Sequence, residues 1–201
     1  MKRKLYNKAR DIIYRCSDSL STIVAKMVFW INDVDYGDHL KVCGRIFMQK
    51  NGRMVIGKNV RINSSFRSNP ISPSNRTGII IRGGVFTIDD DSGISNAYFV
   101  CQNEIRIGKQ VMIGAGCQFY DTDFHPLNSQ CRSGEYRDDS KTRTKPIVVE
   151  DKVFIGAGAI ILKGTHIGEG AIIGAGSVVS GKIPPYEIWA GNPAKYIRKG
   201  E

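Results

Sequence analysis

The stretch Val149–Val179, VEDKVFIGAGAIILKGTHIGEGAIIGAGSVV, decides the fold of this chain. Large aliphatic residues recur every six positions through it, at Val149, Ile155, Ile161, Ile167, Ile173 and Val179. A period of six matches neither the 3.6-residue repeat of an amphipathic helix nor the simple alternation of a strand. The repeat therefore predicts short strands joined by turns, which wind into a solenoid with the aliphatic residues inside.

The same pattern appears earlier in the chain, where glycine follows an aliphatic residue at Ile56-Gly57, Ile107-Gly108 and Ile113-Gly114. Three hexapeptides would close one triangular coil, and successive coils would stack with parallel hydrogen bonding at roughly 4.8 Å. The stretch Asn63–Glu104 keeps aliphatic residues but loses the glycines, so its strand bounds are weakly predicted. We expect a helical segment over 1–34, a solenoid over 35–183 with a loop at 126–146, and a tail over 184–201.

The composition bounds the function classes. A chain of 201 residues with 41% hydrophobic content can form one compact domain. The net charge of +10 suggests a polyanionic partner, although charge alone does not choose among nucleic acid, an anionic membrane and a phosphate-rich cofactor. Five cysteines without a C-x-x-C pair fit neither a disulfide framework nor a zinc site, which favours a reducing cytoplasm.

The N-terminal residues Lys2–Ile31 mix aliphatic and basic side chains in a helix-like amphipathic pattern. The longest apolar stretch there, Ile23–Ile31, is interrupted by Lys26 and is too short to span a bilayer. A helix packed on the body of the protein or on a subunit neighbour is the favoured interpretation. Peripheral contact with a membrane surface is the alternative.

The six-residue frame is interrupted between Phe119 and Val149 by a long polar stretch that begins Tyr-Asp-Thr-Asp-Phe-His-Pro. Such insertions leave the stack as loops and are frequently functional. His125 lies at the root of this loop, and imidazole can accept a proton from a hydroxyl at neutral pH. Asp123 is a candidate to orient its ring. Alternatively, His125 is an ordinary loop histidine, or it points inward because it falls on the six-residue frame.

The repeat [LIV]-G-x-x-[STAV]-x resembles that of the hexapeptide-repeat acyltransferases, whose fold is a left-handed parallel β-helix. Across Ile105–Arg198 the order of motifs is similar to the maltose, galactoside and polysaccharide O-acetyltransferase group. The shared motifs are the His125-Pro126 pair, Gly134-Glu135-Tyr136, Lys145-Pro146, and a tail with Ser180-Gly181-Lys182 and Ala190–Arg198. The resemblance implies a mainly β protein with a left-handed β-helix, an N-terminal helical extension and a protruding loop.

The resemblance also implies roles for particular residues. His125 matches the catalytic base, and the backbone N–H of Ala157 matches the group that stabilises a tetrahedral oxyanion. Positions that contact acetyl-CoA match Ala157, Ala175, Ser180, Gly181, Lys182, Lys195 and Arg198. This chain departs from the family where Ser180-Gly181 replaces Thr-Lys and where Lys195 replaces an arginine, so the phosphate contacts are expected to differ.

These features predict a bacterial, cytoplasmic enzyme that moves an acetyl group from acetyl-CoA to a sugar hydroxyl, without a metal or a nucleic-acid partner. The acceptor expected from the polysaccharide-modifying branch is a cell-envelope, capsule or lipopolysaccharide glycan or its precursor. By resemblance the chain is a homotrimer, in which His125 faces coenzyme residues of an adjacent subunit. Two alternatives stay open. The protein could N-acetylate an aminosugar, or it could be a catalytically silent scaffold.

A γ-type carbonic anhydrase is the rival within the same fold, since it uses a solenoid with zinc held by three histidines at subunit interfaces. The chain has three histidines in all. They are far apart in the sequence and lack a close pair, which argues against this rival. His166 was expected to be structural, because it falls at a solvent-facing corner of its hexapeptide.

Overall fold

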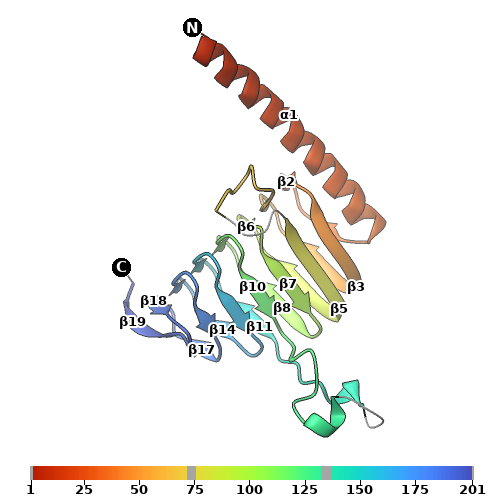
Figure 1. The fold of residues 1–201 in the computed structure, drawn as a ribbon, viewed down its shortest axis with the longest axis vertical. Coiled ribbons are helices and arrows are strands. Elements are labelled where there is room, and N and C mark those ends of the chain that lie inside the picture. Colours follow the sequence, from red (N-terminus) through yellow and green to blue (C-terminus); the bar gives the residue numbers. More distant parts are fainter. Residues whose placement is uncertain (1, 72–75, 133–136, 201) are drawn as a thin grey trace.

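The computed structural model describes residues 2–71, 76–132 and 137–200, which form one α-helix, two short 3-10 helices (Ser129–Cys131 and Asp139–Lys141) and a stack of short strands (Figure 1). Helix α1 spans Lys2–Ile31. The strands are β1 Asp35–Tyr36, β2 Lys41–Gly44, β3 Ile46–Ile56, β4 Arg61–Ser64, β5 Thr77–Ile88, β6 Gly93–Ser95, β7 Tyr98–Cys101, β8 Glu104–Ile107, β9 Met112–Ile113, β10 Gln118–Tyr120, β11 Ile147–Val149, β12 Phe154–Ile155, β13 Ile160–Leu162, β14 His166–Ile167, β15 Ile172–Ile173, β16 Val178–Val179, β17 Lys182–Ile183, β18 Glu187–Ala190 and β19 Lys195–Lys199.

The strands make the three faces of a prism. The first face stacks β16, β13, β10, β7 and the first half of β5, and the second stacks β17, β14, β11, β8 and the second half of β5. The third face stacks β18, β15, β12, β9, β6, β4 and β2. Every pair in these stacks is parallel, and only β19 runs antiparallel, on β18. The predicted mainly β, parallel β-helix fold is confirmed.

The core of the prism consists of the residues that the six-residue frame places inside. Ile155, Ile161, Ile167 and Ile173 are fully buried, each directly above or below its counterpart in the next coil. In the wider coils aromatic rings fill the interior, and Phe99 stacks on Phe119 with 4.7 Å between ring centroids. Close packing of these side chains supplies the main driving force for the fold.

Glycine is required where the coils approach one another most closely. A Cβ on Gly156 would stand 2.5 Å from the backbone nitrogen of Ala175 in the next coil, which no real contact permits. The glycine after the aliphatic residue in the repeat therefore reflects the distance between coils, rather than backbone flexibility.

The irregular stretch Asn63–Glu104 contains one long strand, β5, that belongs to two faces of the prism. Gly78–Ile81 of β5 pair with β7, whereas Val85–Ile88 pair with β8, so that β5 continues around an edge of the prism. β3 pairs along most of β5 with a register shift between Asn51 and Arg53, which carries the same bend into the coil above.

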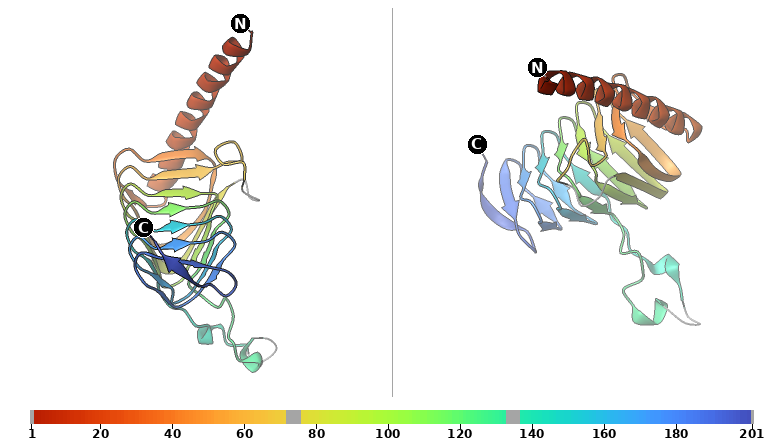
Figure 2. Two further views of the ribbon diagram at one scale, coloured as in Figure 1. Left: turned by 90° about the vertical axis from the view of Figure 1, so that its left-hand side faces the viewer. Right: turned by 45° about the horizontal axis from the view of Figure 1, so that its top comes forward.

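Helix α1 crosses the N-terminal end of the stack, as the two views in Figure 2 show. Thr22 covers the free edge of β2, because its hydroxyl donates to the Val42 carbonyl and accepts from the Val42 N–H, both at 3.0 Å. Covering an edge strand in this way prevents further strand pairing. No helix in the described part of the chain is long and apolar enough to cross a membrane.

Candidate active site

Two edges of the prism carry the residues that the sequence singled out. The edge between the first and second faces bears Gln102–Asn103, the loop 121–146, Lys163–Thr165 and Ser180–Gly181, and we call it the loop edge. The edge between the third and first faces bears the turns at 114–117, 156–159 and 174–177, and we call it the turn edge. The loop projects well away from the prism (Figure 1).

Asp121 ties the root of the loop to the coil above. Its side chain is fully buried, and its carboxylate accepts the N–H of Gln102 at 2.8 Å and the N–H of Asn103 at 2.7 Å. Burial raises the pKa of this carboxyl, while the backbone hydrogen bonds act in the opposite direction. The backbone carbonyl of Asp121 also accepts the N–H of Lys145, which joins the two ends of the loop.

Asp123 ties the same root to the coil below. One carboxylate oxygen lies 3.1 Å from Nζ of Lys163, and the other is buried without a hydrogen-bond partner in the described structure. Both side chains are largely shielded, at 18% and 25% exposure, so this ion pair is less screened than a surface pair. The carboxylate of Asp123 thus pairs with Lys163 rather than with the His125 ring. The predicted role of Asp123, orientation of that ring, stays a prediction.

His125 points toward solvent rather than into the core, so the inward-pointing alternative is wrong. Its ring makes no hydrogen bond to another described residue, and its backbone N–H donates to the Asp123 carbonyl at 2.7 Å. Beside it a hollow of about 330 Å³ is lined by Pro126, Leu127, Asn128, Lys141 and Arg143. A base that is accessible next to a cationic hollow can accept a proton from a bound hydroxyl.

Ala157 lies on the turn edge, where its N–H donates to no carbonyl in the described structure. Glycine at 114 keeps this nitrogen uncrowded, since a Cβ there would stand 2.6 Å from it. Ala175 occupies the same turn position one coil below, and the Ala157 carbonyl accepts from Gly176 at 2.8 Å. The N–H of Ala175 likewise donates to no carbonyl in the described structure, so an unpaired amide is common to these turns. Ala157 differs from Ala175 in the coil to which it belongs.

The remaining predicted coenzyme residues are all exposed. Ser180 and Gly181 lie on the loop edge, two coils below the loop root, and Lys182 begins β17 on the second face. Lys195 and Arg198 lie on β19, which pairs with β18 on the third face. The structure therefore brings His125, Ser180 and Gly181 to one edge, and it places Ala157 and Ala175 on another. Gly134, Glu135 and Tyr136 lie outside the described residues.

His166, expected to be structural, makes a contact that sequence reasoning missed. Its Nε2 lies 2.6 Å from Oε1 of Glu150, whose other oxygen accepts the Glu169 N–H at 2.8 Å. The hydrogen bond from His166 lowers the pKa of Glu150. Both residues line an open hollow of about 360 Å³ with Arg106 on the second face. The six-residue frame placed His166 outside, but it could not show that Glu150 lies one coil above.

No cluster of three potential metal ligands occurs among residues 2–71, 76–132 and 137–200. Cys117 is a buried thiol in the core of the stack. Burial raises the pKa of Cys117 to about 11, so this thiol stays protonated at neutral pH.

Comparison with known proteins identifies the repeat. Residues 146–181 match the family described as bacterial transferase hexapeptide (six repeats). The putative acetyltransferase C18B11.09c of Schizosaccharomyces pombe is 42% identical over 53% of this chain and 48% of its own length. The putative acetyltransferase SAV2555 of Staphylococcus aureus is 41% identical over 47% of this chain and 55% of its own length. The chain thus spans about half the length of the curated relatives it matches.

Solved structures support the same fold over most of the chain. AntD, an N-acyltransferase from Bacillus cereus crystallised with dTDP-4-amino-4,6-dideoxyglucose and coenzyme A, has a TM-score of 0.71 at 20% identity, over 88% of this chain and 89% of AntD. The hexapeptide-repeat acetyltransferase VCA0836 from Vibrio cholerae, complexed with acetyl-CoA, has a TM-score of 0.52 at 25% identity, over 88% of this chain and 78% of VCA0836. The resemblance to hexapeptide-repeat acetyltransferases is confirmed.

Proposed function

We propose that this hexapeptide-repeat protein is an acyltransferase that moves an acetyl group from acetyl-CoA to a sugar hydroxyl, with His125 as the general base. One observation carries the proposal. The solenoid is interrupted by a long loop, and the buried carboxylate of Asp121 and the largely shielded carboxylate of Asp123 hold the root of that loop, which presents an exposed histidine beside a cationic hollow.

The proposed reaction moves one proton and one acetyl group. His125 accepts the proton of the acceptor hydroxyl as its oxygen attacks the thioester carbonyl carbon. The N–H of Ala157 donates to the carbonyl oxygen, which carries negative charge while the new C–O bond forms. The C–S bond then breaks, and His125 returns the proton to the departing thiolate. The base is thus regenerated in each cycle.

Acetyl-CoA is a substrate in this scheme, and the exposed residues suit its two ends. The free N–H groups of the turn edge can hydrogen-bond the amide carbonyls of a pantetheine arm. Lys182, Lys195 and Arg198 supply exposed positive charge for the phosphates at the other end.

A site shared between neighbouring chains follows from the proposal, because one chain carries the base and the oxyanion donor on different edges of the prism, and the resemblance implies that the assembly is a homotrimer. A second chain packed alongside would bring the turn edge of one prism to the loop edge of its neighbour. The test mixes two inactive variants, His125→Asn and Ala157→Pro, after dissociation and reassembly. Recovered turnover in the mixture supports a shared site. A mixture as inactive as its components, with intact mixed trimers, contradicts it.

The acceptor that we favour is an anionic sugar, such as a cell-envelope glycan or a sugar nucleotide. Lys141 and Arg143 line the hollow beside His125, and clustered cations suit phosphate or carboxylate groups. The similarity to AntD, which was crystallised with a dTDP-linked aminosugar, supports a sugar nucleotide in particular.

N-acetylation of an aminosugar is the second candidate, and one observation favours it. The His125 ring has no hydrogen-bonded orienting partner in the described structure, and an amine depends less on a base than a hydroxyl does. The discriminating assay measures thiol release from acetyl-CoA with matched hydroxy- and amino-sugar nucleotides. Release with the hydroxy-sugar supports O-acetylation, release with the amine alone supports N-acetylation, and none with any acceptor favours a silent scaffold.

A further inference from the structure

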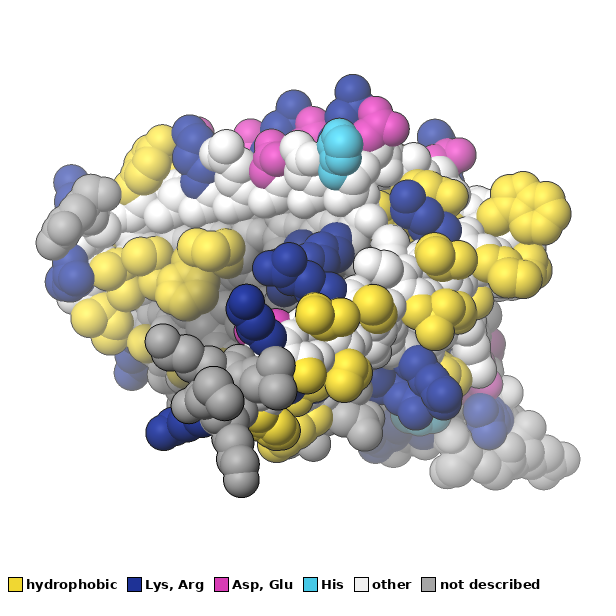
Figure 3. All heavy atoms as spheres, turned by 90° about the horizontal axis from the view of Figure 1, so that it is seen from above, with side chains coloured by type: hydrophobic (Ala, Val, Ile, Leu, Met, Phe, Trp, Pro, Cys, Tyr) yellow, Lys and Arg dark blue, Asp and Glu magenta, His cyan; other side chains and the backbone are white. Residues whose placement is uncertain are grey.

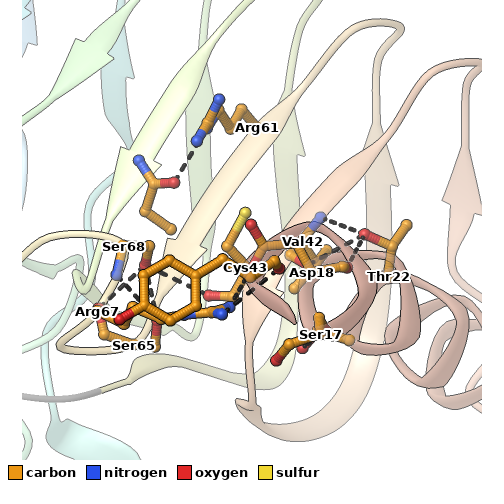
Figure 4. Close-up of polar contacts among 12 residues, drawn as sticks. Ser17, Asp18, Thr22, Val42, Cys43, Arg61, Ser65, Arg67 and Ser68 are labelled. Carbon is orange, nitrogen blue, oxygen red and sulfur yellow. Dashed lines mark hydrogen bonds and ion pairs between the residues drawn. The ribbon is translucent and has the colours of Figure 1, made fainter. Parts of the chain in front are cut away.

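Helix α1 touches the prism with one narrow stripe. Asp18, Thr22, Ala25 and Phe29 follow one another at steps of four, three and four, and these side chains face the body of the protein. Figure 4 shows two of the contacts, Thr22 with Val42 on β2 and Asp18 with Arg67 from the loop after β4. Phe29 is fully buried, and Ala25 is nearly so. The helix is thus anchored by its C-terminal half.

The opposite face of α1 is apolar and uncovered. At 3.6 residues per turn, positions two apart lie roughly 200° around a helix. Each contact residue is therefore followed, two positions on, by a residue on the far side of the helix, and two of these, Leu20 and Val24, also border an open groove between α1 and residues 44–46. The four far-side residues are Leu20, Val24, Met27 and Ile31, and they are 61%, 50%, 59% and 64% exposed. Ile13, seven positions before Leu20, extends the same face at 63% exposure.

Trp30 and Ile23 widen this outward face, at 76% and 64% exposure. An apolar surface that runs along most of a helix exceeds the scattered exposed residues of ordinary soluble proteins and marks an interaction site. The sequence favoured a helix packed on the body of the protein or on a subunit neighbour. The helix does contact the body, but through the stripe that contains Asp18, Thr22, Ala25 and Phe29 rather than through this apolar face.

Positive charge borders the apolar face in the N-terminal half of the helix. Lys8 and Arg15 are seven residues apart along one flank, and Arg3 and Arg10 are seven apart along the other. Asp11 pairs with Arg10 and offsets the charge of that residue, whereas Asp18 pairs with Arg67 on the inner side. Figure 3, which looks onto this end of the molecule, shows hydrophobic and basic side chains gathered together.

We propose that the outward face of α1 binds the surface of a bilayer that contains anionic lipids. Helices that lie in a membrane interface combine an apolar face with Lys and Arg along its borders, as α1 does. A second copy of the chain fits less well, because two such faces would bring basic flanks of the same sign together. The helix also crosses the end of the stack, so its outward face is free to approach a flat surface (Figure 2).

The first test measures co-flotation of the full-length protein with vesicles. We expect binding to phosphatidylcholine vesicles that contain roughly 30% phosphatidylglycerol, and much weaker binding to pure phosphatidylcholine, with a decline at high salt. The double variant Leu20→Glu/Met27→Glu should bind at least about tenfold more weakly. Ile71→Glu is the matched control, because Ile71 is 73% exposed but lies in the loop after β4 rather than on α1, and it should bind like the wild type.

Trp30 provides a second readout that does not depend on charge substitutions. Its emission should shift to the blue with anionic vesicles, and the shift should be absent in Trp30→Phe. Wild-type protein that stays unbound with an unshifted emission would overturn the proposal. A double variant that still floats but sediments as a smaller assembly would assign the face to a second copy instead. None of these measurements uses acetyl-CoA or an acceptor, so their outcome is independent of the proposed catalysis.

Discussion

The anchoring of the loop at 121–146 can be tested by substitution of Asp121. Asp121→Ala removes the acceptor of two part-buried hydrogen bonds, those from the backbone N–H groups of Gln102 and Asn103. A hydrogen bond to a charged acceptor contributes about 1.5–3 kcal/mol, and relief from burying the carboxylate offsets part of the sum. We therefore expect a loss of about 2–4 kcal/mol, which lowers the thermal midpoint by roughly 5–15 °C in a chain of this size.

The assay is thermal unfolding followed by circular dichroism, with Asp139→Ala as the control. Asp139 lies in the same loop, but its carboxylate is exposed and forms an ion pair with the equally exposed Arg137, so the midpoint should not change measurably. The reasoning is refuted if the two variants unfold at the same temperature. Because burial raises the folded-state pKa of Asp121, its contribution to stability should be greatest at acid pH and decline as pH rises through that pKa.

Three further outcomes follow from the stack. Gly156→Ala should lower the free energy of unfolding by about 1–3 kcal/mol, because the added Cβ clashes with the next coil. Gly93→Ala is the control, since its added Cβ meets open space and should not change the free energy of unfolding. Equal midpoints of chemical denaturation for the two variants would contradict this. Phe119→Ala should cost about 3–5 kcal/mol in the same assay, because the ring is fully buried, and a loss under 1 kcal/mol would count against the packing described. Because the pKa of Glu150 is lower in the folded than in the unfolded state, its bond to His166 stabilises the protein above the unfolded-state pKa, and this stabilisation is lost as pH falls through the folded-state pKa. Glu150→Gln should therefore flatten the acid limb of the curve of stability against pH. An unchanged acid limb would refute the coupling.

The interior of the solenoid was predictable from the sequence because burial dictates the period. Each inward position must be aliphatic, and each position where two coils approach closely must be glycine. The pairs Ile155-Gly156 and Ile173-Gly174 therefore predict both a buried side chain and the turn that follows it. The continuous strand β5 was not predictable in this way. Its bend at Gly83-Gly84 coincides with the register shift of β3 between Asn51 and Arg53. The six-residue frame contains no signal for this bend.

The candidate site was predictable only in part. The interrupted frame located the loop and His125. It could not show that Asp121 bonds to the coil before the loop or that Asp123 pairs with Lys163 in the coil after it. The hydrogen bond between His166 and Glu150 joins residues 16 apart, a spacing that reflects the circumference of a coil. The direction of the apolar face of α1 was missed, because amphipathicity fixes which residues share a face but not which face meets the body.

The role of His125 is the central claim about this protein, and turnover of His125→Asn tests it most directly. The measurement is thiol release from acetyl-CoA with the best hydroxy-sugar acceptor, compared with His39→Asn. Asparagine tolerates the positive φ of 59° at position 39, so this control should fold and turn over normally. The account predicts that His125→Asn loses at least about a hundredfold in turnover while its thermal midpoint stays within a few degrees of the wild type. Turnover equal to that of His39→Asn would remove His125 from the mechanism.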